Sequence, residues 1–443
     1  MNLVSSFEAL LAGFLPLLTA PSFENLKVIA RGWVFCLERR TVTRVLQVGG
    51  GIYQKHHSAF HRFFSRAQWC IDELSRVLLG MLLRFVPESE TVYLSVDDTL
   101  CRKRGLHVFG TCMHHDPLLS CRKFAVVNWG HNWVVVGVNL RFSFAPGITW
   151  CLPFAFRLYI SRTRPKSQRW REEHVHRTRP ELAVEILQNV SRWFPDRDFH
   201  VIGDSAYGGK SVSKQLPARF HLTSRVHMRA ELYSAPGPSA GGRGRPRKRG
   251  DRLPTPEEMA GIRTGWKSVR LTIYGKKKEV LTKQATGLWR AAGYRRVCVT
   301  VVRDPAKKTP DQAFFTTVLE TTPEQVLERY AQRWSIEVAF QNTKSHFGFE
   351  DPQSRKRKAV ERTAPLAMVL YSLVVAWFAQ VGFKKYKAID RPWYTRKSTP
   401  AFVDILITIR KESLREHFLN VCEWTPENRK TLRLFTEVLR LTG

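Results

Sequence analysis

Two short apolar segments that each end in an acidic residue constrain the fold of this chain more than any other feature. The segment TVYLSVDDTL (91 to 100) alternates small and apolar residues around Asp97 and Asp98. The segment DFHVIGDSAYGG (198 to 209) runs through apolar residues into Asp204 and a glycine-rich break. Both patterns predict short buried strands with an acid at the carboxyl end. The chain therefore predicts an α/β fold in which two strand carboxylates can meet an acid from a helix packed on the same sheet.

A candidate third acid lies in RYAQRWSIEVAFQNTKSHFGF, where Tyr330, Arg333, Glu337 and Lys344 stand at offsets 0, 3, 7 and 14. On one continuous α-helix, at about 100° per residue, these side chains project within roughly 60° of one another. Taken singly, Glu337 and Lys344 are also typical of a solvated helix face, and Tyr330 is also typical of a residue packed in the core. Trp334 lies on another face and is predicted as core.

Three carboxylates that converge at one sheet edge are what two hard divalent cations require. In a two-metal site, one ion activates the attacking oxygen and the other stabilises the leaving oxygen of a phosphodiester. The set of acids, cations and phenol therefore indicates metal-dependent chemistry on a phosphodiester.

The spacing Tyr330-x2-Arg333-x3-Glu337-x6-Lys344 resembles the Y-R-E-K signature of bacterial insertion-sequence transposases of the DDE type. The sequences VDDT and GDSAYGG are similar to the first-acid and second-acid motifs of the same group. NWGHNWVVVGV resembles the strand pair between them, so the resemblance spans about residues 90 to 350.

The resemblance implies a transposase that cleaves and rejoins the ends of an insertion sequence, by cut-and-paste, in an RNase H-like domain. The implied catalytic and metal-binding residues are Asp97, Asp204 and Glu337, which would hold two Mg²⁺ ions, with Mn²⁺ as a substitute. The residues that would hold the end phosphates are Tyr330, Arg333 and Lys344. The expected partner is double-stranded DNA, both transposon ends and target, bound by a homodimer in the bacterial cytoplasm.

Three points stay open in this interpretation. Asp98 is the alternative first acid; Asp97 is preferred because it gives the family's Asp-x-Thr pattern and shares a strand face with Tyr93 and Ser95. A nuclease of the same fold that cuts without joining strands is one alternative function. A DNA-binding regulator derived from a transposase is the other.

The charge of the chain favours a polyanionic partner. Seventy-one Lys and Arg against 38 Asp and Glu give a formal charge of +33, which points to nucleic acid or an anionic membrane. DNA-packaging proteins share such a charge but rarely carry 43% hydrophobic residues and 13 tryptophans. A globular DNA enzyme fits this composition better.

The cysteines and the apolar runs exclude other classes. Eight cysteines without a C-x-x-C pair predict reduced thiols in a cytosolic protein. Cys112, His114, His115 and Cys121 fit no usual zinc spacing. The run 366 to 379 is flanked by charges and falls short of the roughly 20 residues of a membrane span, so it is predicted as a core helix.

The expected domains follow the distribution of these patterns. Glu337 follows Asp204 at a distance of 133 positions, which exceeds what one crossover helix needs, so an insertion is predicted there. The expected division is a helical, helix-turn-helix-like DNA-binding domain (1–90), an RNase H-like catalytic domain (91–220 and 305–380), a mainly β insertion (221–304) and a helical C-terminal region (381–443).

Two basic segments are candidates for DNA contact. In the N-terminal region His56, His57, Arg62 and Arg66 are predicted to touch phosphates, unless these helices only pack on the catalytic domain. The Gly-, Pro- and Arg-rich loop 236–254 contains RGRP, which resembles an AT-hook. A generic basic linker is the alternative for this loop. Its predicted DNA-binding residues are Arg243, Arg245, Arg247 and Lys248.

Overall fold

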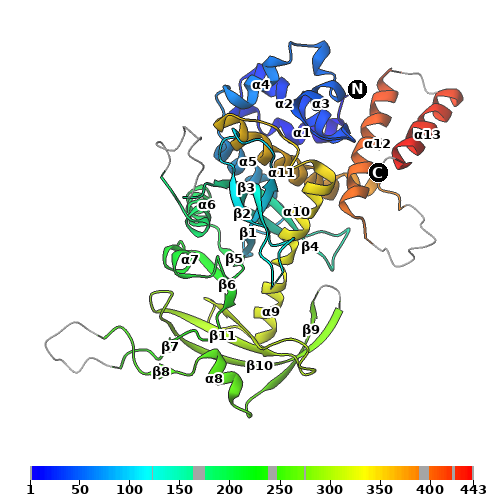
Figure 1. The fold of residues 1–443 in the computed structure, drawn as a ribbon. Coiled ribbons are helices and arrows are strands. Elements are labelled where there is room, and N and C mark those ends of the chain that lie inside the picture. The colour runs from blue at the N-terminus through cyan, green and yellow to red at the C-terminus, as the bar shows by residue number, and fades with distance from the viewer. Residues whose placement is uncertain are drawn as a thin grey trace.

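The structure is a computed structural model that describes residues 2–121, 123–162, 175–237, 247–273, 276–388, 399–421 and 425–441. In these ranges a large mixed sheet is surrounded by helices (Figure 1). The helices are α1 (Ser5–Ala12), α2 (Ala20–Phe35), α3 (Val42–Val48), α4 (Ser58–Ser65), α5 (Ile71–Leu83), α6 (Arg179–Trp193), α7 (Lys210–Gln215), α8 (Pro256–Gly261), α9 (Pro323–Ala331), α10 (Trp334–Phe347), α11 (Arg357–Gln380), α12 (Phe402–Val421) and α13 (Pro426–Leu441).

The strands alternate with these helices in the middle of the chain. They are β1 (Val92–Arg102), β2 (Cys112–His115), β3 (Val127–Arg141), β4 (Thr149–Tyr159), β5 (Phe199–Gly203), β6 (Phe220–Val226), β7 (Leu232–Tyr233), β8 (Arg252–Leu253), β9 (Lys267–Ile273), β10 (Lys276–Trp289), β11 (Arg295–Arg303) and β12 (Gln312–Thr316). Both predicted acid-bearing segments form strands. Asp204 directly follows β5 as predicted, but β1 continues to Arg102, so the prediction that Asp97 ends its strand is wrong.

The centre of the sheet combines antiparallel and parallel pairs. β3 is antiparallel to β1 and to β4, whereas β5 is parallel to β1 on its other side and β6 is parallel to β5. The acid-bearing strands β1 and β5 are therefore direct neighbours. Helix α6 lies between β4 and β5 in the chain, and the order of strand, hairpin, helix and strand is consistent with an RNase H-like domain.

The predicted insertion supplies strands that continue this sheet. Beyond β6 the order runs β12, β11, β10, β7 and β8, and β9 pairs with β10 (lower part of Figure 1). Strands β7 to β11 all lie within the segment 221–304, where the sequence predicts a mainly β insertion. Because β12 returns beside β6, the sheet runs from the acids into the insertion without interruption.

The basic loop of the insertion is described only at its carboxyl end. Arg243 and Arg245 lie outside the described residues, and Arg247 and Lys248 are exposed. Next to them the Arg249 guanidinium lies 4.1 Å from the centroid of the Tyr233 ring. The proposed DNA contacts of this loop stay a prediction.

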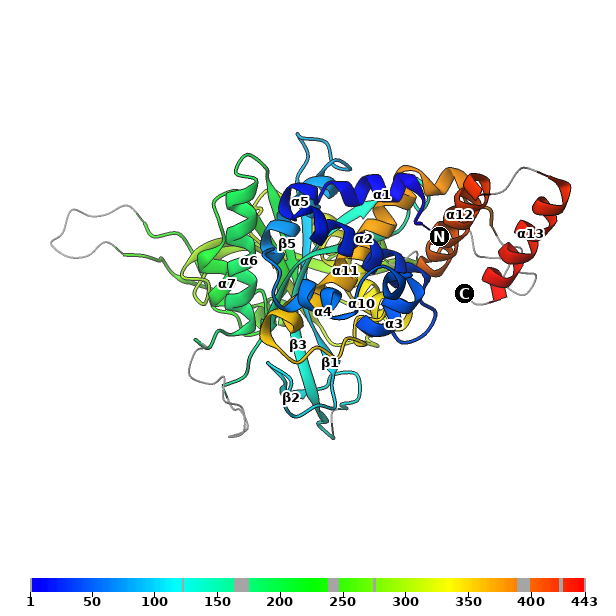
Figure 2. The same ribbon diagram turned by 90° about the horizontal axis from the view of Figure 1, so that it is seen from above.

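The N-terminal helices share one hydrophobic core with the sheet. This core contains Phe7 of α1, Trp33 of α2 and Leu79 of α5 together with Val96 of β1. Thr41 caps α3, since its hydroxyl accepts the Arg44 N–H at 3.3 Å. Viewed from above, these helices lie beside α10 and α11 (Figure 2).

Helix α11 is the central core helix. It is long and apolar enough to cross a membrane by length and composition, but 89% of its most apolar window is buried inside the protein. Helix α12 joins the same core, and the Arg410 Nε donates to the Val34 carbonyl at 2.7 Å. The sequence prediction of a buried helix over 366–379 agrees with this arrangement.

Candidate active site

Strand register places the first two acids side by side. Val96 of β1 is paired with Gly203 of β5, and Asp97 and Asp204 are the residues that follow them. Neighbouring strands lie about 4.8 Å apart. The Asp204 carboxylate is oriented by its own turn, since its Oδ1 accepts the N–H groups of Ala206 at 2.9 Å and Tyr207 at 3.3 Å.

Arg333 links the strand acids to the helix acid. Its guanidinium donates to Asp97 Oδ2 at 3.0 Å and to Glu337 Oε1 at 2.6 Å. The Arg333 side chain is only 17% exposed, and its Nε has no hydrogen-bond partner among the described residues. A single cation therefore stands between two acids that are 240 residues apart in the chain.

The four-residue pattern does not lie on one continuous helix, contrary to the sequence prediction. Helix α9 ends at Ala331 and α10 begins at Trp334. Between them the Arg333 N–H donates to the Tyr330 carbonyl at 3.0 Å, a three-residue spacing typical of a 3₁₀ turn. Gln332 and Arg333 keep right-handed helical backbone angles, so the chain tightens here without reversing.

This break changes the surroundings of two aromatic residues. Tyr330, at the end of α9, packs on Phe314 of β12 with ring centroids 4.7 Å apart, and Arg333 lies 5.9 Å from its ring. Trp334 is 47% exposed, so its prediction as a core residue is wrong. A helical wheel cannot place these residues, because it assumes the unbroken 3.6-residue period that the tightened turn interrupts.

Asp97 and Asp98 point to opposite faces of the sheet, as neighbours on a strand must. Asp97 faces α10, and its Oδ1 accepts the Asp98 backbone N–H at 2.8 Å. Asp98 accepts from Asn132 at 2.8 Å, Arg179 at 2.7 Å and the Tyr207 hydroxyl at 2.9 Å. Only Asp97 thus shares a face with Glu337, while Asp98 is held by three donors on the other side.

Lys344 holds α10 against the end of β1. Its Nζ donates to the Leu100 carbonyl at 2.6 Å and lies 3.4 Å from the Glu350 carboxylate. With 19% of its side chain exposed, this lysine contacts protein groups in the present arrangement. The structure thus gathers Asp97, Asp204, Arg333 and Glu337 and places Lys344 further along the same helix.

The burial of Asp97 has the largest effect on the electrostatics of the site. Burial raises the pKa of the Asp97 carboxyl to about 7; Arg333 opposes this shift, and Asp98 and Asp204 add to it. Burial by itself lowers the pKa of Arg333, but the carboxylates of Asp97 and Glu337 outweigh it and raise the pKa above its ordinary value. The buried acid therefore favours a neighbouring cation.

The residue types suit a divalent metal, although the side chains are not drawn together to ligate one. Three carboxylates are the hard oxygen donors that Mg²⁺ prefers, and the raised pKa of Asp97 marks charge that a cation would offset. Among the described residues, however, no three His, Cys, Asp or Glu side chains stand close enough to hold an ion. Arg333 provides the positive charge between Asp97 and Glu337 instead.

The sequence prediction missed the residues that fix Asp98. Arg179 is the first residue of α6, directly after Thr178, whose side chain caps that helix in a capping box with Glu181. The letters TRPE signal this helix start, but nothing local indicates that the arginine reaches β1. Tyr207 lies inside the GDSAYGG motif, but its hydrogen bond to Asp98 forms only because the fold places β1 beside the turn after β5.

The mixed sheet, with Asp97 in the middle of β1 and Asp204 directly after the neighbouring strand β5, is consistent with an RNase H-like domain of the DDE type. Residues 13–290 match the family described as DDE superfamily endonuclease, and the chain belongs to this family. The match includes Asp97 and Asp204 and ends before α10, so Glu337 and its neighbours are assigned from sequence spacing and geometry alone. Comparison with curated proteins finds no match. Enzymes of the DDE superfamily act on DNA and use divalent metals.

Proposed function

We propose that this chain is the transposase of an insertion sequence, which cleaves DNA at the element's ends and joins the freed ends to a target. The observation that carries the proposal is the bridge by Arg333 between Asp97, in register beside Asp204, and Glu337. This bridge connects the helix acid Glu337 to the strand acid Asp97 through one guanidinium, which supports a shared role of the three acids in end cleavage.

The proposed catalytic acids are Asp97, Asp204 and Glu337, which would hold Mg²⁺ or Mn²⁺. The metal would supply an activated oxygen nucleophile and charge neutralisation at the phosphodiester. Arg333 has a second role, because a guanidinium that already lies beside both acids can donate to a phosphate oxygen when DNA enters. Tyr330 lies beside Arg333. Lys344 holds α10 against β1 through the Leu100 carbonyl and would bind a phosphate when DNA is present.

Asp98 is proposed as a positioning residue. Its bonds to Arg179 of α6 and Tyr207 after β5 tie the back of β1 to the turn that carries Asp204. Loss of these bonds would move Asp97 and Asp204 relative to each other without removing either acid.

The decisive experiment maps cleavage of the DNA that flanks the coding sequence. With Mg²⁺ the wild-type protein is expected to cut at the element's termini. Glu337→Gln is expected to bind the same DNA but to lose cleavage by more than about 1000-fold, the range seen when one member of a catalytic set is removed. Glu328→Gln, an exposed acid on α9, is the matched control and keeps wild-type cleavage. Cleavage by Glu337→Gln at the control's rate would refute the assignment.

A pre-cut end separates the proposal from its two alternatives. A transposase joins the free 3′-hydroxyl of such an end to a second duplex. A nuclease of the same fold cleaves intact ends but leaves the pre-cut end unjoined. A regulator binds both substrates and changes neither.

A further inference from the structure

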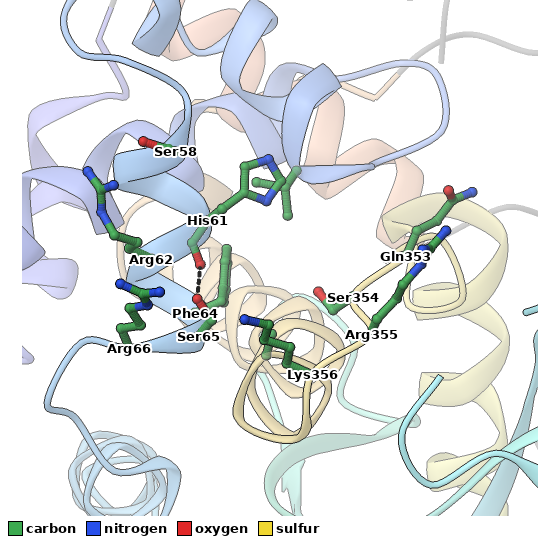
Figure 3. A pocket seen from close by; sticks show the side chains of 12 residues that line it. Ser58, His61, Arg62, Phe64, Ser65, Arg66, Gln353, Ser354, Arg355 and Lys356 are labelled. Atoms are coloured by element: carbon green, nitrogen blue, oxygen red, sulfur yellow. Dashed lines mark hydrogen bonds between the residues drawn. The ribbon is translucent and has the colours of Figure 1, made fainter. Parts of the chain in front are cut away.

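A second candidate site lies outside the cluster of acids, between α4 and the segment that leads into α11. It is a pocket of about 450 Å³ (Figure 3). Residues of α4 form one side, and the segment from Gln353 to Lys356 forms the other. Its lining residues are Val42, Ser58, His61, Arg62, Phe64, Ser65, Arg66, Gln353, Ser354, Arg355, Lys356 and Ala359.

The pocket carries positive charge that no described residue neutralises through an ion pair. Arg62, Arg66, Arg355 and Lys356 are all exposed, and none of them forms an ion pair with a described residue. No Asp or Glu is among the lining residues. The next residue, Arg357, differs from them, because it pairs with Glu361 at 3.2 Å.

Buried contacts hold both walls of the pocket in place. On one side Arg362 of α11 donates to the Phe64 and Ala67 carbonyls at 3.2 Å and 2.9 Å, which fixes the end of α4. On the other side the Arg355 carbonyl accepts the Phe109 N–H at 3.0 Å. Hydrogen bonds therefore hold the backbone on both sides of the pocket, while its four cationic side chains form no ion pair with a described residue. Such an arrangement is expected of a preformed binding site.

The side of the pocket formed by Gln353 to Lys356 is also connected to the candidate active site. Lys103, directly after β1, donates from Nζ to the carbonyls of Glu350 at 2.7 Å and Pro352 at 2.9 Å. Glu350 in turn lies 3.4 Å from Lys344 of α10. The segment 350–356 thus runs from the end of the helix that carries Glu337 to the pocket.

We propose that this pocket binds the sugar-phosphate backbone of duplex DNA. The DNA molecule bound here is the one whose phosphodiester is cleaved at Asp97, Asp204 and Glu337. The inference rests on the proposed function and adds a binding site to it. Guanidinium, ammonium and hydroxyl donors suit phosphate oxygens, and the four cations come from two elements far apart in the chain. Such contacts position DNA without reading its bases.

The test measures DNA affinity against salt concentration in EDTA, so that no cleavage is needed. The full chain is compared with the pairs Arg62→Gln/Arg66→Gln and Arg355→Gln/Lys356→Gln. The matched control is Arg84→Gln/Arg141→Gln: both residues are exposed and unpaired among the described residues, and both adjoin the Phe85–Phe142 contact. Arg84 and Arg141 lie near the start of β1, whereas Lys103 and the pocket segment lie near its end, so the control pair is at the opposite end of the sheet. Two duplexes of 30 base pairs are used, one from the flanking DNA and one unrelated.

Each pocket pair is expected to lower the slope of log affinity against log salt by about 2, since each lost phosphate contact removes about 0.9. The reduction should be equal for both duplexes, and the control pair should change the slope by less than half as much. Unchanged slopes, or an equal loss in the control, would overturn the site. A loss confined to the flanking duplex would also overturn it, because that result indicates base reading. A chain that fails to cleave but shows the expected slopes would refute the proposed function and leave the pocket standing.

Discussion

Arg333 is the residue on which the geometry of the candidate site depends. It satisfies two buried or half-buried acids at once, and Asp97 would otherwise lie beside Asp204 and Asp98 with no cation. Removing one partner of such a pair leaves the other charge buried without compensation. The arginine therefore acts as an internal counterion for both acids.

Replacing this counterion should destabilise the protein and increase its response to metal. Arg333→Gln is expected to lower the free energy of unfolding by about 3 kcal/mol, as for other broken buried ion pairs. Mg²⁺ should then raise the thermal midpoint more in the variant than in the wild type, because a divalent ion can neutralise the uncompensated acids.

Differential scanning calorimetry with Mg²⁺ or EDTA measures both effects. Arg76→Gln is the control: its pair with Glu73 is exposed and remote from the acids, and its loss should cost at most about 1 kcal/mol. Equal shifts by Mg²⁺ in Arg333→Gln and wild type would contradict the counterion role.

At the scale of elements, local patterns predicted the site only where the decisive interactions are local. The strand that carries Asp97, the strand before Asp204 and the cap at Thr41 follow from residue alternation and side-chain chemistry within a few positions. The break before Trp334 follows a helix, α9, that packs on β12 and β9, and these contacts join residues outside the segment that contains the break. The continuity of the sheet into the insertion was missed for the same reason, since strand pairing is non-local.

The β5–β6 pair provides a test of stability against pH. Buried His200 on β5 shares a hydrogen bond of 2.7 Å with the Thr223 hydroxyl on β6. Burial lowers the pKa of His200 to about 3, with smaller contributions from Arg329 and His221. The unfolded chain therefore binds this proton near pH 6.5 and the folded chain does not. The resulting stability is present above about pH 6.5 and is lost as the pH falls towards 3.

His200→Gln removes the imidazole, so the folded and unfolded states no longer differ in proton binding at this position. Between pH 6 and 4 the free energy of unfolding should fall less steeply in the variant, by about 1.4 kcal/mol per pH unit. Urea unfolding at pH 6, 5 and 4 measures the two slopes. Parallel slopes for variant and wild type would show that the imidazole is already charged in the folded protein.

At the scale of the whole molecule, the N-terminal helices and the sheet are joined by one core rather than placed side by side. Arg362 of α11 is 8% exposed and donates to three carbonyls around the end of α4, those of Phe64, Ala67 and Trp69. Trp33 of α2 donates to the Phe347 carbonyl of α10 at 2.9 Å. We therefore expect both parts to unfold together, although the sequence divides them into separate domains.

Arg362→Met tests this coupling because it keeps the aliphatic packing and removes the donors. Two buried carbonyls and one part-buried carbonyl lose their partner, at about 1–3 kcal/mol each before relaxation, so a net loss of about 3 kcal/mol is expected. Hydrogen exchange followed by mass spectrometry should then show faster exchange in α2 and in β5 by the same factor, because one global opening exposes both. The exposed neighbour Arg357→Met should cost at most about 1 kcal/mol. Faster exchange in α2 alone would mean that the N-terminal helices open as a separate unit, and the shared core would then not couple them to the catalytic sheet.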